Sequence, residues 1–99
     1  MVRHIILWKL KDGISDIEKV KSEAKENLEA LVGKVEGLSS LKLHTCPLAS
    51  SNCDMMLESV LESAEALAHY QSHPAHVAAA NTYVRPFTDA RLCLDFEVN

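Results

Sequence analysis

Segments typical of β-strands alternate along this chain with segments typical of amphipathic helices, and their order restricts the folds that the chain can adopt. Strands are indicated by short runs rich in Val, Ile, Leu and aromatic residues, and helices by apolar residues three or four positions apart. The order is strand, helix, strand, strand, helix, strand. Such an order typically forms a four-stranded antiparallel sheet with both helices on one face, the ferredoxin-like α+β fold with βαββαβ topology. The predicted strands are residues 2–10, 38–46, 54–61 and 91–98.

The predicted helices begin at recognisable positions. Ser15 and Glu18 have the S-x-x-E spacing of a capping box, which predicts that the first helix begins there. This helix should end before Gly33 or Gly37, because glycine commonly follows the last turn of a helix. Pro74 should divide the second helical region in two, because proline disfavours helical geometry in the residue before it and is favoured in the first turn of a helix.

The first predicted strand is apolar on both of its faces. Ile6 and Trp8 point to one side of the sheet and Ile5 and Leu7 to the other, because successive side chains of a strand alternate. Two helices can cover only one face, and a contiguous apolar patch on the other usually marks an interface. We therefore expect a homodimer, a dimeric α/β barrel in which a second copy covers the open face. That face would present Ile5, Leu7, Met56 and Val60, and the alternative is a monomer in which Lys9 and Glu58 keep it wet.

The composition restricts the partners that this protein can have. The formal net charge of -4 argues against nucleic acid, which normally requires a basic patch. The longest apolar run, residues 5–8, is far too short to span a membrane, and we expect no secretion signal. An odd number of cysteines without a C-x-x-C pair is typical of a reducing cytoplasm. We therefore expect one cytoplasmic domain over residues 1–99, with Cys46 and Cys53 as free buried thiols and Cys93 in the core.

Three stretches of the sequence resemble the stress-responsive A/B barrel domain family, Dabb. They are VRHIILWKLKDG at residues 2–13, ALAHYQSHPAHVAAA at residues 66–80 and LCLDFEV at residues 92–98. The Tyr-x-x-His-Pro-x-His pattern at residues 70–76 is the most specific part. The resemblance covers essentially the whole chain and implies a dimeric α+β barrel over residues 1–99.

The family resemblance also implies candidate functional residues. Members of the family include stress-associated plant proteins, many proteins without an assigned activity, and a plant polyketide cyclase that forms olivetolic acid by an intramolecular aldol reaction. The resemblance to this cyclase implies catalytic roles for Tyr70 and His76 and a pocket position for His4. Met55 stands where the cyclase has a histidine. The bulky aromatic side chains on the first helix of the cyclase are replaced nearby by Glu23, Ala24 and Asn27.

Tyr70 and His76 have side chains suited to proton transfer beside a carbonyl group. A histidine exchanges protons near neutral pH, and a tyrosine hydroxyl can donate to a carbonyl oxygen on which negative charge develops. On an unbroken helix two residues at this spacing would diverge by about 120°, so they can converge only if the chain bends at residues 72–74. The structural alternative is that Tyr70 is a core aromatic and His76 a hydrogen-bonded histidine between helix and sheet.

A metal site is a further alternative for the histidines. His69, His73 and His76 have the i, i+4, i+7 spacing that aligns ligands on a continuous helix. Pro74 interrupts that helix, so we expect neither a metal nor another cofactor.

These observations predict a small, mostly apolar pocket between the sheet and the helices. It would bind a small hydrophobic or carbonyl compound without turnover. Two alternatives are a cofactor-free lyase or cyclase that uses an acid–base pair, and a structural, stress-protective oligomer without catalysis. The predicted catalytic residues are Tyr70 and His76, and the predicted ligand-binding residues are His4, Ile6, Trp8, Met55 and Leu57.

Overall fold

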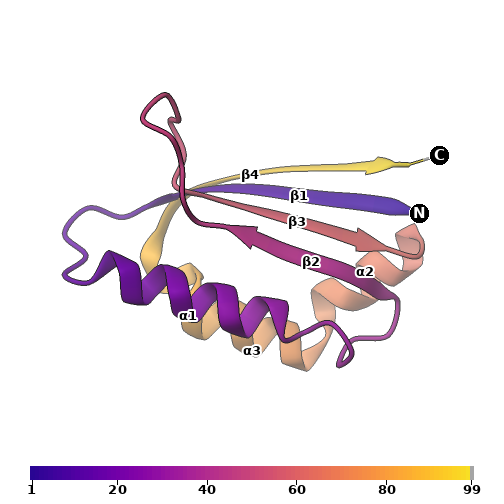
Figure 1. Cartoon of the computed structure of the whole chain (residues 1–99). Helices are drawn as coiled ribbons and strands as arrows, with labels where there is room; N and C mark the ends of the chain where they lie inside the picture. The colour runs from indigo at the N-terminus through magenta and orange to yellow at the C-terminus, as the bar shows by residue number, and fades with distance from the viewer. Residues whose placement is uncertain (99) are drawn as a thin grey trace.

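The computed structural model describes residues 1–98 as one sheet with all of its helices on a single face (Figure 1). The four strands lie in the order β2-β3-β1-β4, and each pair of neighbours is antiparallel. This arrangement confirms the predicted ferredoxin-like α+β fold. The elements are β1 (Val2–Leu10), α1 (Ile17–Glu29), β2 (Leu38–His44), β3 (Met55–Leu61), α2 (Ala64–Ser72), α3 (Pro74–Tyr83), the 3-10 helix η1 (Arg85–Phe87) and β4 (Thr88–Glu97).

Helix α1 begins one residue later than the sequence pattern predicted. Asp16 is its N-cap, and the Asp16 carboxylate accepts a hydrogen bond from the backbone N–H of Lys19 at 3.1 Å. The expected capping box of Ser15 and Glu18 is therefore wrong. The physical reason is that serine and aspartate cap helices equally well, so the composition of this segment allowed two adjacent starting points.

The second helical region is broken at His73, as predicted. This residue has extended backbone angles, ends α2 and caps α3. Its Nδ1 atom accepts a hydrogen bond from the backbone N–H of Ala75 at 3.0 Å. Pro74 occupies the first turn of α3, where its missing N–H leaves no helical hydrogen bond unmade.

The helix-facing side of the sheet is closed along β1 and β3. Alternate side chains of these two strands are buried beneath the helices, and the core continues into α1, α2 and α3. Together these apolar side chains are the main source of stability in the single chain, because burial of each contributes roughly 1.5–3 kcal/mol. On the two central strands they are Val2, Ile6, Trp8, Met55, Leu57 and Leu61.

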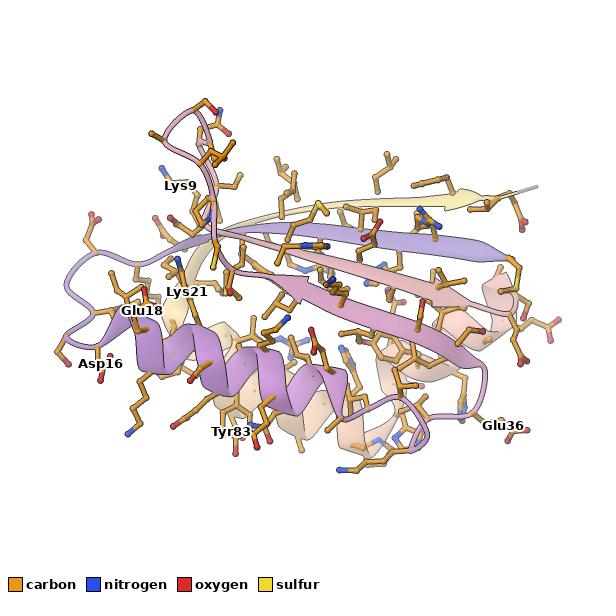
Figure 2. All side chains as sticks on the ribbon, in the orientation of Figure 1. Lys9, Asp16, Glu18, Lys21, Glu36 and Tyr83 are labelled. Carbon is orange, nitrogen blue, oxygen red and sulfur yellow. The ribbon has the colours of Figure 1, made fainter. Side chains whose placement is uncertain are left out.

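The opposite face of the sheet carries no helix and presents the predicted apolar side chains, beside which Glu58 contacts Arg3 and His44. Figure 2 shows side chains standing on this upper side of the sheet, away from the helices. Ile5, Leu7, Met56 and Val60 are only half-buried on this face. The outer strand adds Leu92 and Leu94, which are 66% and 64% exposed, and Phe96, which is 42% exposed. We call these seven residues the open face.

Strand β4 forms one edge of the sheet and extends beyond the cover of the helices. Cys93 is exposed there, so its predicted place in the core is wrong. Cys93 lies opposite Ile6 on the neighbouring strand and points to the same side as the helices, but no helix covers β4 because this strand forms the edge of the sheet. Cys46 and Cys53 are free, as expected, but Cys46 is exposed and Cys53 is half-buried. The loop of residues 45–54 that carries them rises on the side of the sheet opposite to the helices (Figure 1).

None of the helices within residues 1–98 has the length and apolar composition required to cross a bilayer.

Candidate functional site

A cavity of about 80 Å³ lies between the sheet and the helices. About 10–15 Å³ of such space holds one water molecule, so the cavity has room for a small ligand of several non-hydrogen atoms. Larger hollows exist at the surface, among them one of about 380 Å³ beneath the loop of residues 45–54, but they are more open and lack a tyrosine–histidine pair. The cavity is lined by Ile6, Trp8, Leu28, Leu57, Tyr70, His76, Ala80, Val84, Arg85, Thr88 and Arg91.

Tyr70 and His76 lie side by side on the cavity wall. The bend between α2 and α3 brings their ring centroids to 4.3 Å, with the ring planes tilted by 42°. Tyr70 is almost completely buried, and this burial raises the pKa of its hydroxyl far above the usual value of 10.0. The hydroxyl is therefore protonated at neutral pH and can act as a hydrogen-bond donor.

His76 is held in a form that suits a proton acceptor. Its Nδ1 atom lies 3.2 Å from the backbone carbonyl oxygen of Gln71. Since a carbonyl oxygen only accepts, Nδ1 carries the proton in this hydrogen bond and Nε2 carries the lone pair. Burial lowers the pKa of His76 below its usual value, and the nearby positive charges of Arg85 and Arg91 lower it further, although the hydrogen bond to Gln71 opposes this shift.

His4 lies behind Tyr70 rather than at the cavity surface. Its ring is 1% exposed and meets the Tyr70 ring edge to face, with 6.2 Å between centroids. The Nδ1 atom of His4 is hydrogen-bonded to the Asp95 carboxylate, its partner across β1 and β4. Cys93 completes the group, because its thiol lies 3.5 Å from the Asp95 oxygen that accepts from it. The dyad of His4 and Asp95 thus fixes the ring that supports Tyr70.

The bend that unites Tyr70 and His76 separates His76 from the other two histidines of the alternative metal site. His69 and His73 contact each other with ring centroids 5.6 Å apart, while His76 turns towards Tyr70. Within residues 1–98, the one group of three possible ligand atoms within 4.8 Å consists of His4, Cys93 and Asp95. Hydrogen bonds account for the closeness of these three side chains.

The structure brings together most of the residues that the sequence suggested for the site. Five of them line the cavity, whereas His4 and Met55 are buried beside it without lining it. Sequence reasoning did not identify Asp95, Arg85 or Arg91. Strand alternation in LCLDFEV could have placed Asp95 opposite His4 if the pairing of the first and last strands had been considered. The five lining residues are Ile6, Trp8, Leu57, Tyr70 and His76.

Comparison with known proteins gives a family match over nearly the whole chain. Residues 2–98 match the family described as the stress responsive A/B barrel domain, Dabb. The chain is 32% identical over 98 residues to stress-response A/B barrel domain-containing protein HS1 of Arabidopsis thaliana, with 97% of this chain and 88% of HS1 covered.

Two solved structures share the fold. A dimeric protein of unknown function with a ferredoxin-like fold from Bacteroides fragilis has a TM-score of 0.90 and 27% identity, with 98% of this chain and 95% of that chain covered. The hydroxynitrile lyase from Passiflora edulis has a TM-score of 0.81 and 17% identity, with 99% of this chain and 93% of that chain covered. At that identity the likeness to the lyase indicates a common fold alone.

Proposed function

Because this chain belongs to the stress responsive A/B barrel domain family, and similar structures are dimeric, we propose that it is a homodimer in which each subunit binds a small carbonyl compound beside Tyr70 and His76. The observation that carries this proposal is that a buried tyrosine ring and a histidine ring, with centroids 4.3 Å apart, lie together at the wall of a cavity. A filled core at this point would have favoured a purely structural protein.

The open face supports the homodimer. Leu92 and Leu94 are about two-thirds exposed in the single chain. Their burial would contribute roughly 2–4 kcal/mol per subunit, at ~1.5–3 kcal/mol for each fully buried side chain. The half-buried side chains of β1 and β3 add to this sum, which must exceed an association cost of ~4–15 kcal/mol.

The protonation states of the two residues support a carbonyl ligand. The protonated hydroxyl of Tyr70 can donate a hydrogen bond to the carbonyl oxygen. The Nε2 lone pair of His76 can accept a proton from the carbon beside that carbonyl. The apolar remainder of the cavity, formed in part by Ile6 and Leu57, suits the hydrocarbon part of such a ligand.

The same pair supports a second candidate function, cofactor-free proton transfer of the kind used by lyases and cyclases. In this step Nε2 of His76 would take a proton from the carbon, the C–H electron pair would form an enolate, and the Tyr70 hydroxyl would stabilise the enolate oxygen. The arrangement of a neutral acceptor and a protonated donor on one wall favours this possibility.

Binding can be measured through the fluorescence of Trp8, the one tryptophan of the sequence, because it lines the cavity. We expect acetone or cyclopentanone to change this fluorescence saturably. Tyr70→Phe should weaken binding by about 2- to 12-fold, the effect of one hydrogen bond worth ~0.5–1.5 kcal/mol. Tyr83→Phe is the matched control. A fluorescence signal that no small ketone changes, or an unchanged affinity in Tyr70→Phe, would contradict the proposal.

Proton transfer can be measured separately by NMR, as exchange of the protons beside the ketone carbonyl with D₂O. If the pair is catalytic, His76→Gln should slow exchange by roughly 10²–10⁴-fold, the usual contribution of a general base. His69→Gln, which removes an exposed imidazole, should leave the rate unchanged. Binding without protein-dependent exchange would leave a binding protein and exclude this second function.

A further inference from the structure

The cavity is positively charged, although the protein as a whole is acidic. The chain has 14 acidic and 10 basic residues, yet the cavity lining contains Arg85 and Arg91 and no carboxylate. The buried tyrosine and the neutral histidine add no negative charge at neutral pH. Any charge that a ligand carries in this cavity therefore meets two guanidinium groups.

The two arginines reach the cavity from different elements. Arg85 begins η1, directly after α3, and Arg91 lies on β4 opposite Trp8. Both residues are exposed, so their charged ends lie towards solvent at the mouth of the cavity, whereas Tyr70 lies at its buried end. The cavity is thus apolar and hydrogen-bonding within and cationic at its opening.

Neither guanidinium takes part in an ion pair in the described part of the chain, although Arg91 lies near the Cys93 thiol. Within residues 1–98, no ion pair joins Arg85 or Arg91 to a carboxylate. Arg85 donates a hydrogen bond to the side-chain oxygen of Asn81 at 2.6 Å, which fixes its position along α3 without cancelling its charge. The positive field of both groups reaches His76, since each lowers the pKa of that imidazole.

We infer that the ligand of this cavity is a short oxo acid, with its carbonyl group directed inwards to Tyr70 and its carboxylate held at the mouth by Arg85 and Arg91. This inference rests on the proposed function and adds the substrate class. Guanidinium groups bind carboxylates with charge-assisted, often bidentate hydrogen bonds, which a neutral ketone cannot make. The cavity volume of about 80 Å³ restricts the acid to a short chain.

Pyruvate and 3-methylbutan-2-one form a matched pair of probes, because an isopropyl group in the neutral ketone replaces the carboxylate. We expect pyruvate to change Trp8 fluorescence at concentrations at least tenfold lower than the neutral ketone, since hydrogen bonds to charged groups contribute ~1.5–3 kcal/mol. The affinity for pyruvate should also fall with added salt, which screens exposed charges, whereas that for the neutral ketone should not.

Substitution of the arginines tests their role directly. The double variant Arg85→Gln/Arg91→Gln should lose at least tenfold in pyruvate affinity and keep its affinity for 3-methylbutan-2-one within about twofold. Both residues are exposed, so the variant should fold, and circular dichroism checks this. Lys34→Gln, which removes an exposed positive charge that does not line the cavity, is the control.

A second readout reports on the position of the carboxylate. Bound pyruvate should raise the pKa of His76 in an NMR titration, because the carboxylate offsets the two guanidinium charges, and 3-methylbutan-2-one should not. Equal affinities for the two probes, or an unchanged preference in the double variant, would overturn the oxo-acid inference while the binding proposal stood. If neither these probes nor neutral ketones changed Trp8 fluorescence, both proposals would be wrong.

Discussion

The two faces of the sheet carry similar side chains but differ in how far these side chains are exposed. On the face towards the helices, Ile6 and Trp8 are 5% and 6% exposed, whereas Leu92 and Leu94 on the open face are 66% and 64% exposed. Aliphatic side chains predominate on both. The difference lies in what covers them: the helices of the same chain on one side, and no helix within residues 1–98 on the other. The comparison teaches that the pattern of apolar residues in a strand shows which faces must be buried, but not whether the same chain or another molecule buries them.

The largest effect should follow from placing a charge on the open face. Leu94→Glu should raise the dissociation constant of the dimer by roughly 30- to 10³-fold, because each of two copies loses the burial of a two-thirds exposed leucine, worth ~1–2 kcal/mol. Sedimentation equilibrium at micromolar concentration should then detect monomers with unchanged helix content. Val32→Glu replaces an exposed apolar residue outside the open face and is the control. A wild-type protein that sediments as a monomer would refute the homodimer.

A comparable effect should follow from truncation on the covered face. In the Leu94→Glu background, where the open face meets water, Leu61→Ala should lower the free energy of unfolding by ~2–5 kcal/mol, because it leaves a cavity at a fully buried site. Val60→Ala, one residue away on the open face, should cost less than ~1 kcal/mol. Urea unfolding followed by circular dichroism measures both. Equal losses in the two variants would mean that the open face is packed within the single chain.

The smallest effect is on the pH dependence of the free energy of unfolding, and it tests how far water is excluded from the cavity wall at His76. Burial keeps the folded-state pKa of His76 below its usual value of 6.5, so the unfolded chain binds more protons in the interval between these two pKa values. The contribution of His76 to stability should be constant above pH 6.5 and fall as the pH decreases through that interval.

This pH dependence can be isolated by urea unfolding between about pH 5 and pH 8. His76→Gln should remove the component described above, and His69→Gln, on the exposed side of α2, should retain it. If wild type and His76→Gln had parallel profiles, the imidazole would be as hydrated as in the unfolded chain. The cavity wall would then resemble the open face rather than the covered one.

Some features of the fold could be predicted because they depend on neighbouring residues. The break before Pro74 is one, since it follows from the geometry of a single dipeptide. The alternation of Ile5 and Ile6 between the two faces is another. Prediction failed at the start of α1, because two adjacent residues were equally suitable as its N-cap. It also failed for Cys93, because the exposure of this side chain depends on whether a helix far away in the sequence covers it.

The candidate site likewise contains residues that the sequence could predict and residues that it could not. Tyr70 and His76 belong to one short motif, so their convergence followed from the bend between them. Arg85 and Arg91 lie in segments without a recognisable motif, and they reach the cavity because β4 pairs with β1 beside the end of α3. Asp95 meets His4 through the same strand pairing, across most of the length of the chain.

The sequence by itself determined the order of the elements, the bend in the second helical region and the apolar character of both sheet faces. These features arise from backbone geometry and side-chain periodicity within a few residues of each other. Only the tertiary structure decided which side chains meet: the dyad of His4 and Asp95, the two arginines at the cavity mouth, and the exposure of β4. The physical reason is that strand register and helix placement minimise the free energy of the whole chain, and no single segment contains that information.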